Sequence, residues 1–89
     1  MSSSEDTLMT FPHDYPLKVM GRNNDDFRSL VLGIVHKHMG AIDHTLIEER
    51  PSRDKNYLGL TVIVRATSKA QLDALYMELT SCEKVMVAL

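Results

Sequence analysis

Cysteine, tryptophan and long apolar runs are scarce in this sequence. It has a single cysteine, Cys82, and no tryptophan. One cysteine excludes an internal disulfide and a multi-thiolate metal site, which suits a reducing compartment. No stretch approaches the roughly 20 apolar residues of a membrane span, and residues 1–10 contain Glu5 and Asp6 instead of a signal peptide's apolar run. We therefore expect a cytoplasmic protein.

An excess of positive charge is also lacking. Ten Lys and Arg stand against twelve Asp and Glu, which gives a formal net charge of -2. This balance argues against a protein whose main task is to neutralise phosphates, and so against nucleic acid as the main partner. The length of 89 residues allows one domain with a small core, to which self-association would add stability.

The first half of the chain predicts a tail, a strand and a helix. Residues 1–10 are serine-rich and aperiodic, so we expect a mobile tail before a single domain over 11–89. Alternation predicts a strand from Tyr15 to Gly21. Apolar residues at helical spacing predict a helix to about Met39. We expect Asn23 or Asn24 to cap its start, Asp25 and Asp26 to lie in its first turn, and Gly40 to end it.

The second half predicts two strands, a helix and a final strand. Asp43 to Arg50 indicates a polar edge strand that Pro51 ends, and Tyr57 to Thr67 a central strand with Leu58, Leu60, Val62, Val64 and Ala66 on its inward face. Ser68 and Gln71 form a capping-box pair before a helix that ends near Cys82. In the last strand, Glu83 to Leu89, alternation predicts Val85, Val87 and Leu89 on one face and Met86 and Ala88 on the other. Leu60, Val62 and Leu75 are predicted core residues.

The order βαββαβ predicts an α+β, ferredoxin-like sandwich. Two right-handed split βαβ units give an antiparallel sheet of order 4-1-3-2 with both helices on one face. The other face is then open to solvent.

Several segments resemble the bacterial YbeD-like family of uncharacterised proteins, over residues 11–89. They are Phe11-Pro12, Tyr15-Pro-Leu-Lys-Val-Met-Gly21, Tyr57, Ala66-Thr67, Leu75-Tyr76 and Leu79. The resemblance implies a fold similar to ACT regulatory domains and, by analogy, small-molecule sensing or allosteric control. It brings no catalytic residues. ACT ligands often lie between strand 1 and helix 1, which here implies Gly21, Arg22, Asn23 and Asn24; the Pro-Gly pair frequent in that loop is absent.

The open face of the sheet is a second candidate site. With the order 4-1-3-2, Met20, Ile63, Met86 and Ala88 are predicted to cluster there beside Arg65, as a surface for a partner or a second copy. The alternative is that these side chains are simply exposed among Lys18, Thr61 and Arg65.

Other chemistries find weaker support in the residues. His36 and His38 point to different sides of a helix, and His13 and His44 lie in distant segments, so we expect no metal site. Cys82 has no base beside it in the sequence and is expected to be structural.

Two proteins of the same fold class offer alternatives. An acylphosphatase-like hydrolase would use Arg22 before the first helix, but the surrounding spacing does not match. An RNA-binding sheet would carry two or three open-face aromatics, where this sequence offers Tyr57. We therefore expect a non-enzymatic regulatory or adaptor module, a homodimer without cofactors, that binds a protein partner or a small metabolite.

Overall fold

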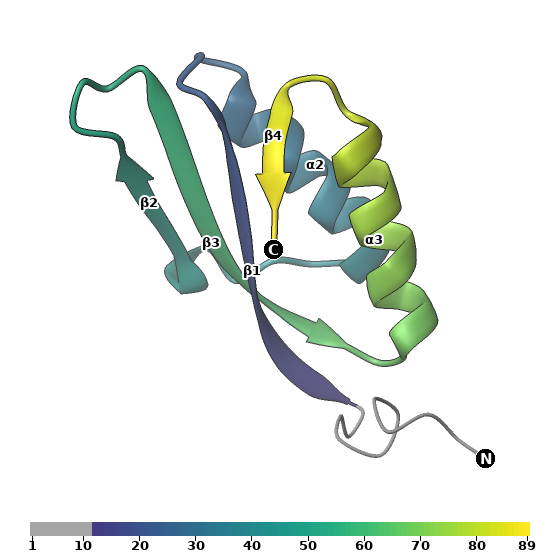
Figure 1. Ribbon diagram of the computed structural model, residues 1–89. Helices are drawn as coiled ribbons and strands as arrows, with labels where there is room; N and C mark the ends of the chain where they lie inside the picture. Colours follow the sequence, from purple (N-terminus) through teal and green to yellow (C-terminus); the bar gives the residue numbers. More distant parts are fainter. Residues whose placement is uncertain (1–11) are drawn as a thin grey trace.

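The computed structural model describes residues 12–89, which form strands and helices in the order βαββαβ (Figure 1). The tail expected over residues 1–10 lies outside the described residues. The elements are β1 (His13–Arg22), α2 (Phe27–Met39), the 3₁₀ helix η1 (His44–Leu46), β2 (Ile47–Pro51), β3 (Tyr57–Ala66), α3 (Lys69–Ser81) and β4 (Val85–Ala88). Their order confirms the predicted α+β, ferredoxin-like sandwich.

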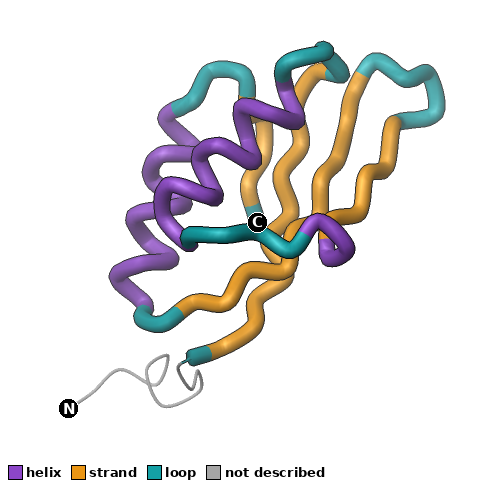
Figure 2. The backbone as a smooth tube through the Cα atoms, turned by 180° about the vertical axis from the view of Figure 1, so that it is seen from behind, coloured by secondary structure: helices purple, strands orange, loops and turns teal. Residues whose placement is uncertain are grey.

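The sheet is antiparallel with the order β2-β3-β1-β4, which is the predicted order 4-1-3-2 read from the other edge. The central strands β1 and β3 pair along their whole length, from His13 opposite Ala66 to Arg22 opposite Tyr57. Figures 1 and 2 show both helices on the same side of the sheet. Within residues 12–89, the other side carries no second layer.

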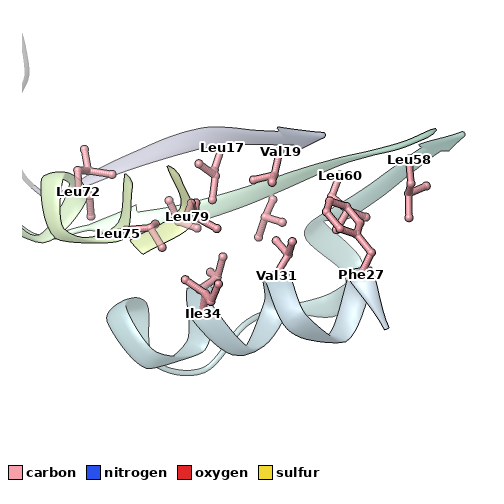
Figure 3. Close-up of a cluster of buried hydrophobic side chains, with 14 residues drawn as sticks. Leu17, Val19, Phe27, Val31, Ile34, Leu58, Leu60, Leu72, Leu75 and Leu79 are labelled. Atoms are coloured by element: carbon pink, nitrogen blue, oxygen red, sulfur yellow. The ribbon is translucent and has the colours of Figure 1, made fainter. Parts of the chain in front are cut away.

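The core fills the space between the helices and the sheet (Figure 3). Because side chains alternate along a strand, every second residue of β3 points to the helices. These residues, all buried, are Leu58, Leu60, Val62, Val64 and Ala66, as predicted. The predicted core positions Leu60, Val62 and Leu75 are each no more than 1% exposed.

Pro16 lies in a central strand, where proline is normally excluded because it cannot donate to a neighbouring strand. Its position explains the exception. Lys18 exchanges two backbone hydrogen bonds with Leu89, of 2.9 and 2.7 Å, next to the end of β4. Backbone nitrogens two residues apart in a strand point toward the same neighbouring strand, so the nitrogen of Pro16, like that of Lys18, points to the β4 side of β1. Because β4 does not extend as far as Pro16, the missing N–H leaves no hydrogen bond of the sheet unmade.

The start of α2 differs from the prediction. Its N-cap is Asp26, and neither Asn23 nor Asn24 caps it. Asn23 is engaged by the β2–β3 hairpin instead, because its backbone N–H donates to the carbonyl of Asn56 and its side-chain amide to that of Lys55, at 2.9 and 3.0 Å. The backbone after β1 therefore stays beside the hairpin as far as Asn23, and the helix begins only at Phe27.

The acidic residues expected in the first turn of α2 precede it. The carboxylate of Asp26 accepts a hydrogen bond from Lys84 at 3.0 Å, and this contact holds the pKa of Asp26 below its ordinary value. The helix ends at Met39 as predicted, and Gly40 has a φ of 82°, a conformation that favours glycine.

The capping-box prediction for α3 is half right. Ser68 is the N-cap, and its hydroxyl accepts a hydrogen bond from the backbone N–H of Gln71 at 3.1 Å. The side chain of Gln71 does not return the bond to Ser68. Its carbonyl oxygen accepts from the N–H of Thr67, and its amide donates to the carbonyl of His38 in α2, so this residue ties the two helices together.

The predicted edge strand from Asp43 to Arg50 is shorter than expected. Residues 44–46 form a 3₁₀ turn, because the Asp43 carboxylate accepts hydrogen bonds from both the N–H and the hydroxyl of Thr45. The strand begins at Ile47 and ends at Pro51, as predicted for its end, and it lies at the edge of the sheet.

The side-chain phase predicted for the last strand is wrong over its second half. A β-bulge opposite Met20 and Gly21 breaks the alternation, so Gly21 lies opposite Val85 whereas Val19 lies opposite Ala88. Val85 and Ala88 consequently both pack against the core. The open face receives Val87, opposite Met20, in place of the expected Ala88.

Candidate functional site

The uncovered face of the sheet is the candidate site, and the alternation of β1 and β3 determines its residues. The positions between the buried ones point away from the helices. In β1 these are Pro16, Lys18, Met20 and Arg22, and in β3 they are Tyr57, Gly59, Thr61, Ile63 and Arg65. The edge strands add Glu48 and Arg50 from β2 and Val87 from β4.

A hollow of about 750 Å³ lies on this face, across the middle of the sheet. Met20, Gly59 and Thr61 are among its lining residues, with Pro51 on one side and Val87 on the other. Gly59 contributes no side chain at the centre of β3. The terminal methyl group of Met20 lies over it, 3.9 Å from where a Cβ would be. The hollow therefore forms at Gly59, which has no side chain, between the long side chains of Met20 and Arg50 on the two neighbouring strands.

Apolar side chains at the hollow are unusually exposed. Met20 is 45% exposed, Val87 44% and Leu89 65%. They come from β1 and from the end of the chain, and they lie near each other because Met20 pairs with Val87 and Lys18 bonds to Leu89. Exposed apolar side chains that gather at a concave surface are typical of a binding site.

Basic side chains surround these apolar groups. Lys18 and Arg50 line the hollow, together with one acidic side chain, that of Glu48, which lies 3.8 Å from Arg50. The guanidinium of Arg22 stacks over the ring of Tyr57 at 6.0 Å from its centroid. The charged side chains of the lining are therefore two cations and one anion, with Arg22 beside them, although the whole chain has a net charge of -2.

The structure places the predicted ligand loop differently. Gly21 and Arg22 belong to β1, and Gly21 is buried against Phe27 and the carbonyl of Lys84. Asn23 is fixed to the β2–β3 hairpin, and Asn24 is exposed. None of the four lines the hollow. That this loop binds a ligand stays a prediction.

The four residues of the predicted partner surface do not form one patch. Met20 lines the hollow, whereas Ile63 and Arg65 line a separate crevice of about 230 Å³ near the end of β3. Arg65 forms an ion pair with Asp14 at 3.3 Å. Met86 is 57% exposed at the β-bulge and does not line the hollow. That these residues bind a partner stays a prediction.

The sequence reading missed Val87, Leu89, Arg50 and Pro51 as parts of this surface. Val87 and Leu89 were assigned to the covered face, because regular alternation gives no signal of the bulge. Arg50 and Pro51 read as an ordinary edge strand and its end, since their proximity to Met20 depends on the pairing of β2 with β3.

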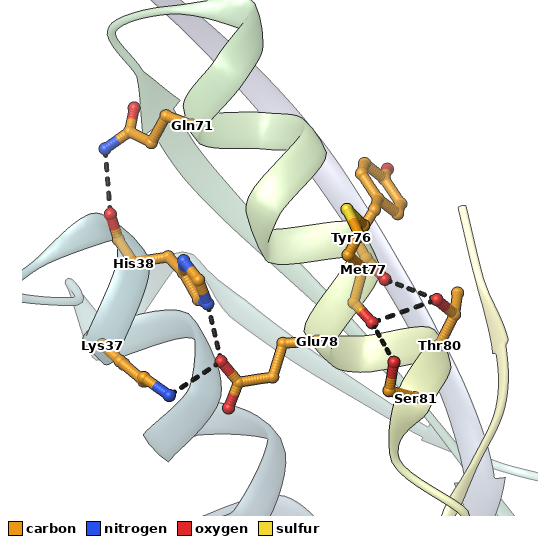
Figure 4. A network of polar contacts seen from close by, with 8 residues as sticks. All are labelled: Lys37, His38, Gln71, Tyr76, Met77, Glu78, Thr80 and Ser81. Carbon is orange, nitrogen blue, oxygen red and sulfur yellow. Dashed lines mark hydrogen bonds and ion pairs between the residues drawn. The ribbon is translucent and has the colours of Figure 1, made fainter.

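Titratable groups between the helices form a structural network that is separate from the hollow (Figure 4). The Glu78 carboxylate in α3 bonds to His38 and Lys37 of α2, at 2.8 and 3.0 Å. These two contacts lower the pKa of Glu78, the one to His38 most. The network therefore holds α3 against α2, on the side of the sheet that faces away from the open face.

A second contact on the helix side joins two phenols. The hydroxyl of Tyr76 in α3 donates to that of Tyr15 in β1 at 3.1 Å. Burial, and then this hydrogen bond, raise the pKa of Tyr76 well above its ordinary value. Tyr76 therefore stays protonated, and its hydrogen bond to Tyr15 ties α3 to β1.

Within residues 12–89, no group of three or more His, Cys, Asp or Glu side chains is placed to hold a metal ion. Cys82 is half-buried at the C-cap of α3. No helix in the described part of the chain is long and apolar enough to cross a membrane.

Comparison with known proteins identifies relatives of matching length. The model of the DUF493 family, described as proteins of unknown function, matches residues 6–89. A UPF0250 protein from Paraburkholderia phytofirmans is 43% identical over 89 residues, which is all of this chain and all of the relative. Another from Ralstonia nicotianae is 48% identical over 84 residues, 94% of this chain and 87% of the relative.

Among solved structures, the solution structure of protein HP0495 from H. pylori is similar, with a TM-score of 0.74. It is 12% identical, and the match covers 100% of this chain and 96% of that one. At this level of identity the likeness supports the fold alone.

Proposed function

The chain belongs to the DUF493 family of UPF0250 proteins, as its resemblance to YbeD-like proteins indicated, and from this premise we propose that it is a non-enzymatic binding module. In this proposal it acts through the hollow on the open face of its sheet. The bound molecule is another protein, which the module regulates or connects to others.

One observation carries the proposal. The hollow gathers exposed apolar side chains, Met20, Val87 and Leu89, on a face that no other element of residues 12–89 covers. Exposed apolar surface costs stability and solubility unless a partner removes it from water. A domain of this size has a small core, so burial against a partner would also stabilise it.

The chemistry around the hollow favours binding over catalysis. Its charged side chains are Lys18, Glu48 and Arg50. The hydroxyl of Ser52, which also lines the hollow, donates to the Asp54 carboxylate and accepts from the N–H of Tyr57, so it is engaged in the hairpin turn. Tyr76 and Glu78, whose pKa values are shifted, lie on the helix side and stabilise the fold. Apolar contact framed by charge is the arrangement of a recognition surface.

Site-specific photo-cross-linking tests this function. We would place p-benzoylphenylalanine at position 61 in place of Thr61, which lines the hollow, and irradiate living cells. The matched control carries the same group in place of Met77, which is 69% exposed on α3. The proposal predicts a protein adduct of defined mass from position 61 and none from position 77. Absence of an adduct at 61, or the same adducts at both positions, would contradict it.

A further inference from the structure

The positive side chains on the helix side are more completely paired with carboxylates than those on the open face. On the helix side, each cation has a carboxylate partner. The pairs are Arg28–Glu49, Lys37–Glu78, Lys69–Asp73 and Lys84–Asp26. On the open face, Arg65 pairs with Asp14 at 3.3 Å, away from the hollow, and Arg50 shares Glu48 at 3.8 Å. Lys18 and Arg22 have no carboxylate partner among residues 12–89. The hollow thus has a basic rim that the protein itself neutralises only in part, at Arg50.

This charge pattern selects among possible occupants. A second copy docked face to face would bring the face that carries Lys18, Arg22 and Arg50 against the same face of its partner, and like charges across an interface cost several kcal/mol by order of magnitude. A symmetric dimer places the same patch on both sides. The open face is therefore a poor surface for self-association.

Single-stranded RNA could pair its phosphates with the cations of the open face, but its bases would find too few aromatic side chains there for stacking. Stable RNA binding on such a sheet uses two or three exposed aromatic side chains for base stacking. In the described residues the open face carries Tyr57, and Arg22 already stacks on it. The centre of the hollow is formed instead by aliphatic and thioether groups, of Met20, Val87 and Leu89.

We propose that the hollow binds an acidic, amphipathic peptide segment of a partner protein. Its apolar side chains would fill the space above Gly59, and its Asp or Glu residues would pair with Lys18 and Arg50 on the rim. Thioether side chains such as Met20 adapt to differently shaped apolar groups, which suits a peptide ligand. This inference rests on the proposed function and specifies the chemistry of the partner.

A defined peptide selection tests it. Short random peptides displayed on phage would be selected on the full chain and depleted on Gly59→Val, which places a branched side chain at the centre of the hollow without a change of charge. We expect the selected peptides to combine an excess of Asp and Glu with Leu, Ile, Met or Phe. A synthetic peptide from this set should shift the amide resonances of Lys18, Met20, Thr61 and Val87.

Charge-reversal variants then distinguish specific contacts of the rim side chains from an effect of the protein's net charge. The Kd of the selected peptide should rise at least about tenfold in Lys18→Glu/Arg50→Glu, since two charge-assisted contacts are lost. The control Lys37→Glu/Lys69→Glu makes the same change of net charge on the helix side and should leave the Kd within about threefold. Circular dichroism and urea unfolding establish that both double variants are folded.

Four results would overturn the inference. The first three are selected peptides without an acidic excess, equal weakening by both double variants, and tighter binding of a random single-stranded RNA pool than of any peptide. Self-association through this face, detected as a dimer in sedimentation that Gly59→Val abolishes, would also overturn it. These failures leave the proposed function in place if position 61 still forms adducts in cells, whereas the absence of adducts removes the proposed function itself.

Discussion

The ring of Phe27 packs directly against Gly21, and no Cβ fits between them. Phe27 is the first residue of α2 and is fully buried, so this contact fixes the point at which the helix meets the sheet. The backbone carbonyl of Lys84, before β4, lies against the same glycine. A glycine that the sequence offered as part of a ligand loop therefore has a packing role in the structure.

Gly21→Ala should destabilise the protein by about 1 to 3 kcal/mol, because the added methyl group collides with a buried ring and with backbone. Urea unfolding measures this loss. The matched control is Gly33→Ala, at an exposed position in α2 where an added Cβ meets nothing within 4 Å. It should stabilise by about 0.5 to 1 kcal/mol, since alanine is the better helix former. If both substitutions had the same sign, the close approach of Phe27 to Gly21 would be wrong.

Leu60→Ala should lower the free energy of unfolding by about 2 to 5 kcal/mol, because it leaves a cavity at the centre of β3. Leu60 is 1% exposed and lies on the face of β3 that the helices cover. Met77→Ala, at a side chain that is 69% exposed, should change stability by no more than about 0.5 kcal/mol. A small effect of Leu60→Ala would mean that the two faces of β3 are assigned the wrong way round.

The stability that Glu78 contributes should depend on pH in a defined direction. Contacts to His38 and Lys37 lower its pKa in the folded protein, so the folded state favours the carboxylate. Its contribution is then fully present above the pKa of the unfolded chain and is lost as the pH falls through the lower, folded pKa. The difference in unfolding free energy between wild type and Glu78→Gln should shrink as the pH falls through this window.

Glu83→Gln is the matched control for this measurement, because Glu83 forms no ion pair with residues 12–89. Its difference from wild type should stay nearly constant over the same pH range. A Glu78→Gln difference that grows toward acid pH would show that the contacts in Figure 4 do not favour the charged carboxylate.

The sequence was sufficient for the topology, the central strands and the buried faces, because these depend on local periodicity. Alternation in β3 identified Leu58, Leu60 and Val62 correctly, and Ser68 marked the start of α3. Such signals involve neighbours in the chain, and tertiary contacts here reinforce them.

The errors occurred where a distant segment determines the local structure. Asn23 does not cap α2, because the β2–β3 hairpin engages it across the sheet. The bulge in β4 moves Ala88 to the core and Val87 to the open face, and it arises from pairing with β1 that no local pattern encodes. The candidate site could not be predicted for the same reason, since strand pairing alone brings together Arg50, Met20 and Val87.

Gly59→Val tests the central claim most directly, in the chain that carries p-benzoylphenylalanine at position 61. The backbone of Gly59 does not have a positive φ, and an added Cβ would meet its neighbours at 3.5 Å or more, so valine is compatible with the strand. Valine also has the higher strand propensity, and the unfolding free energy should be unchanged or higher. The account predicts a folded protein whose in-cell adduct from position 61 disappears, because the valine side chain occupies the centre of the hollow where the partner's apolar side chain would lie. A folded variant that keeps the adduct at wild-type yield would contradict it.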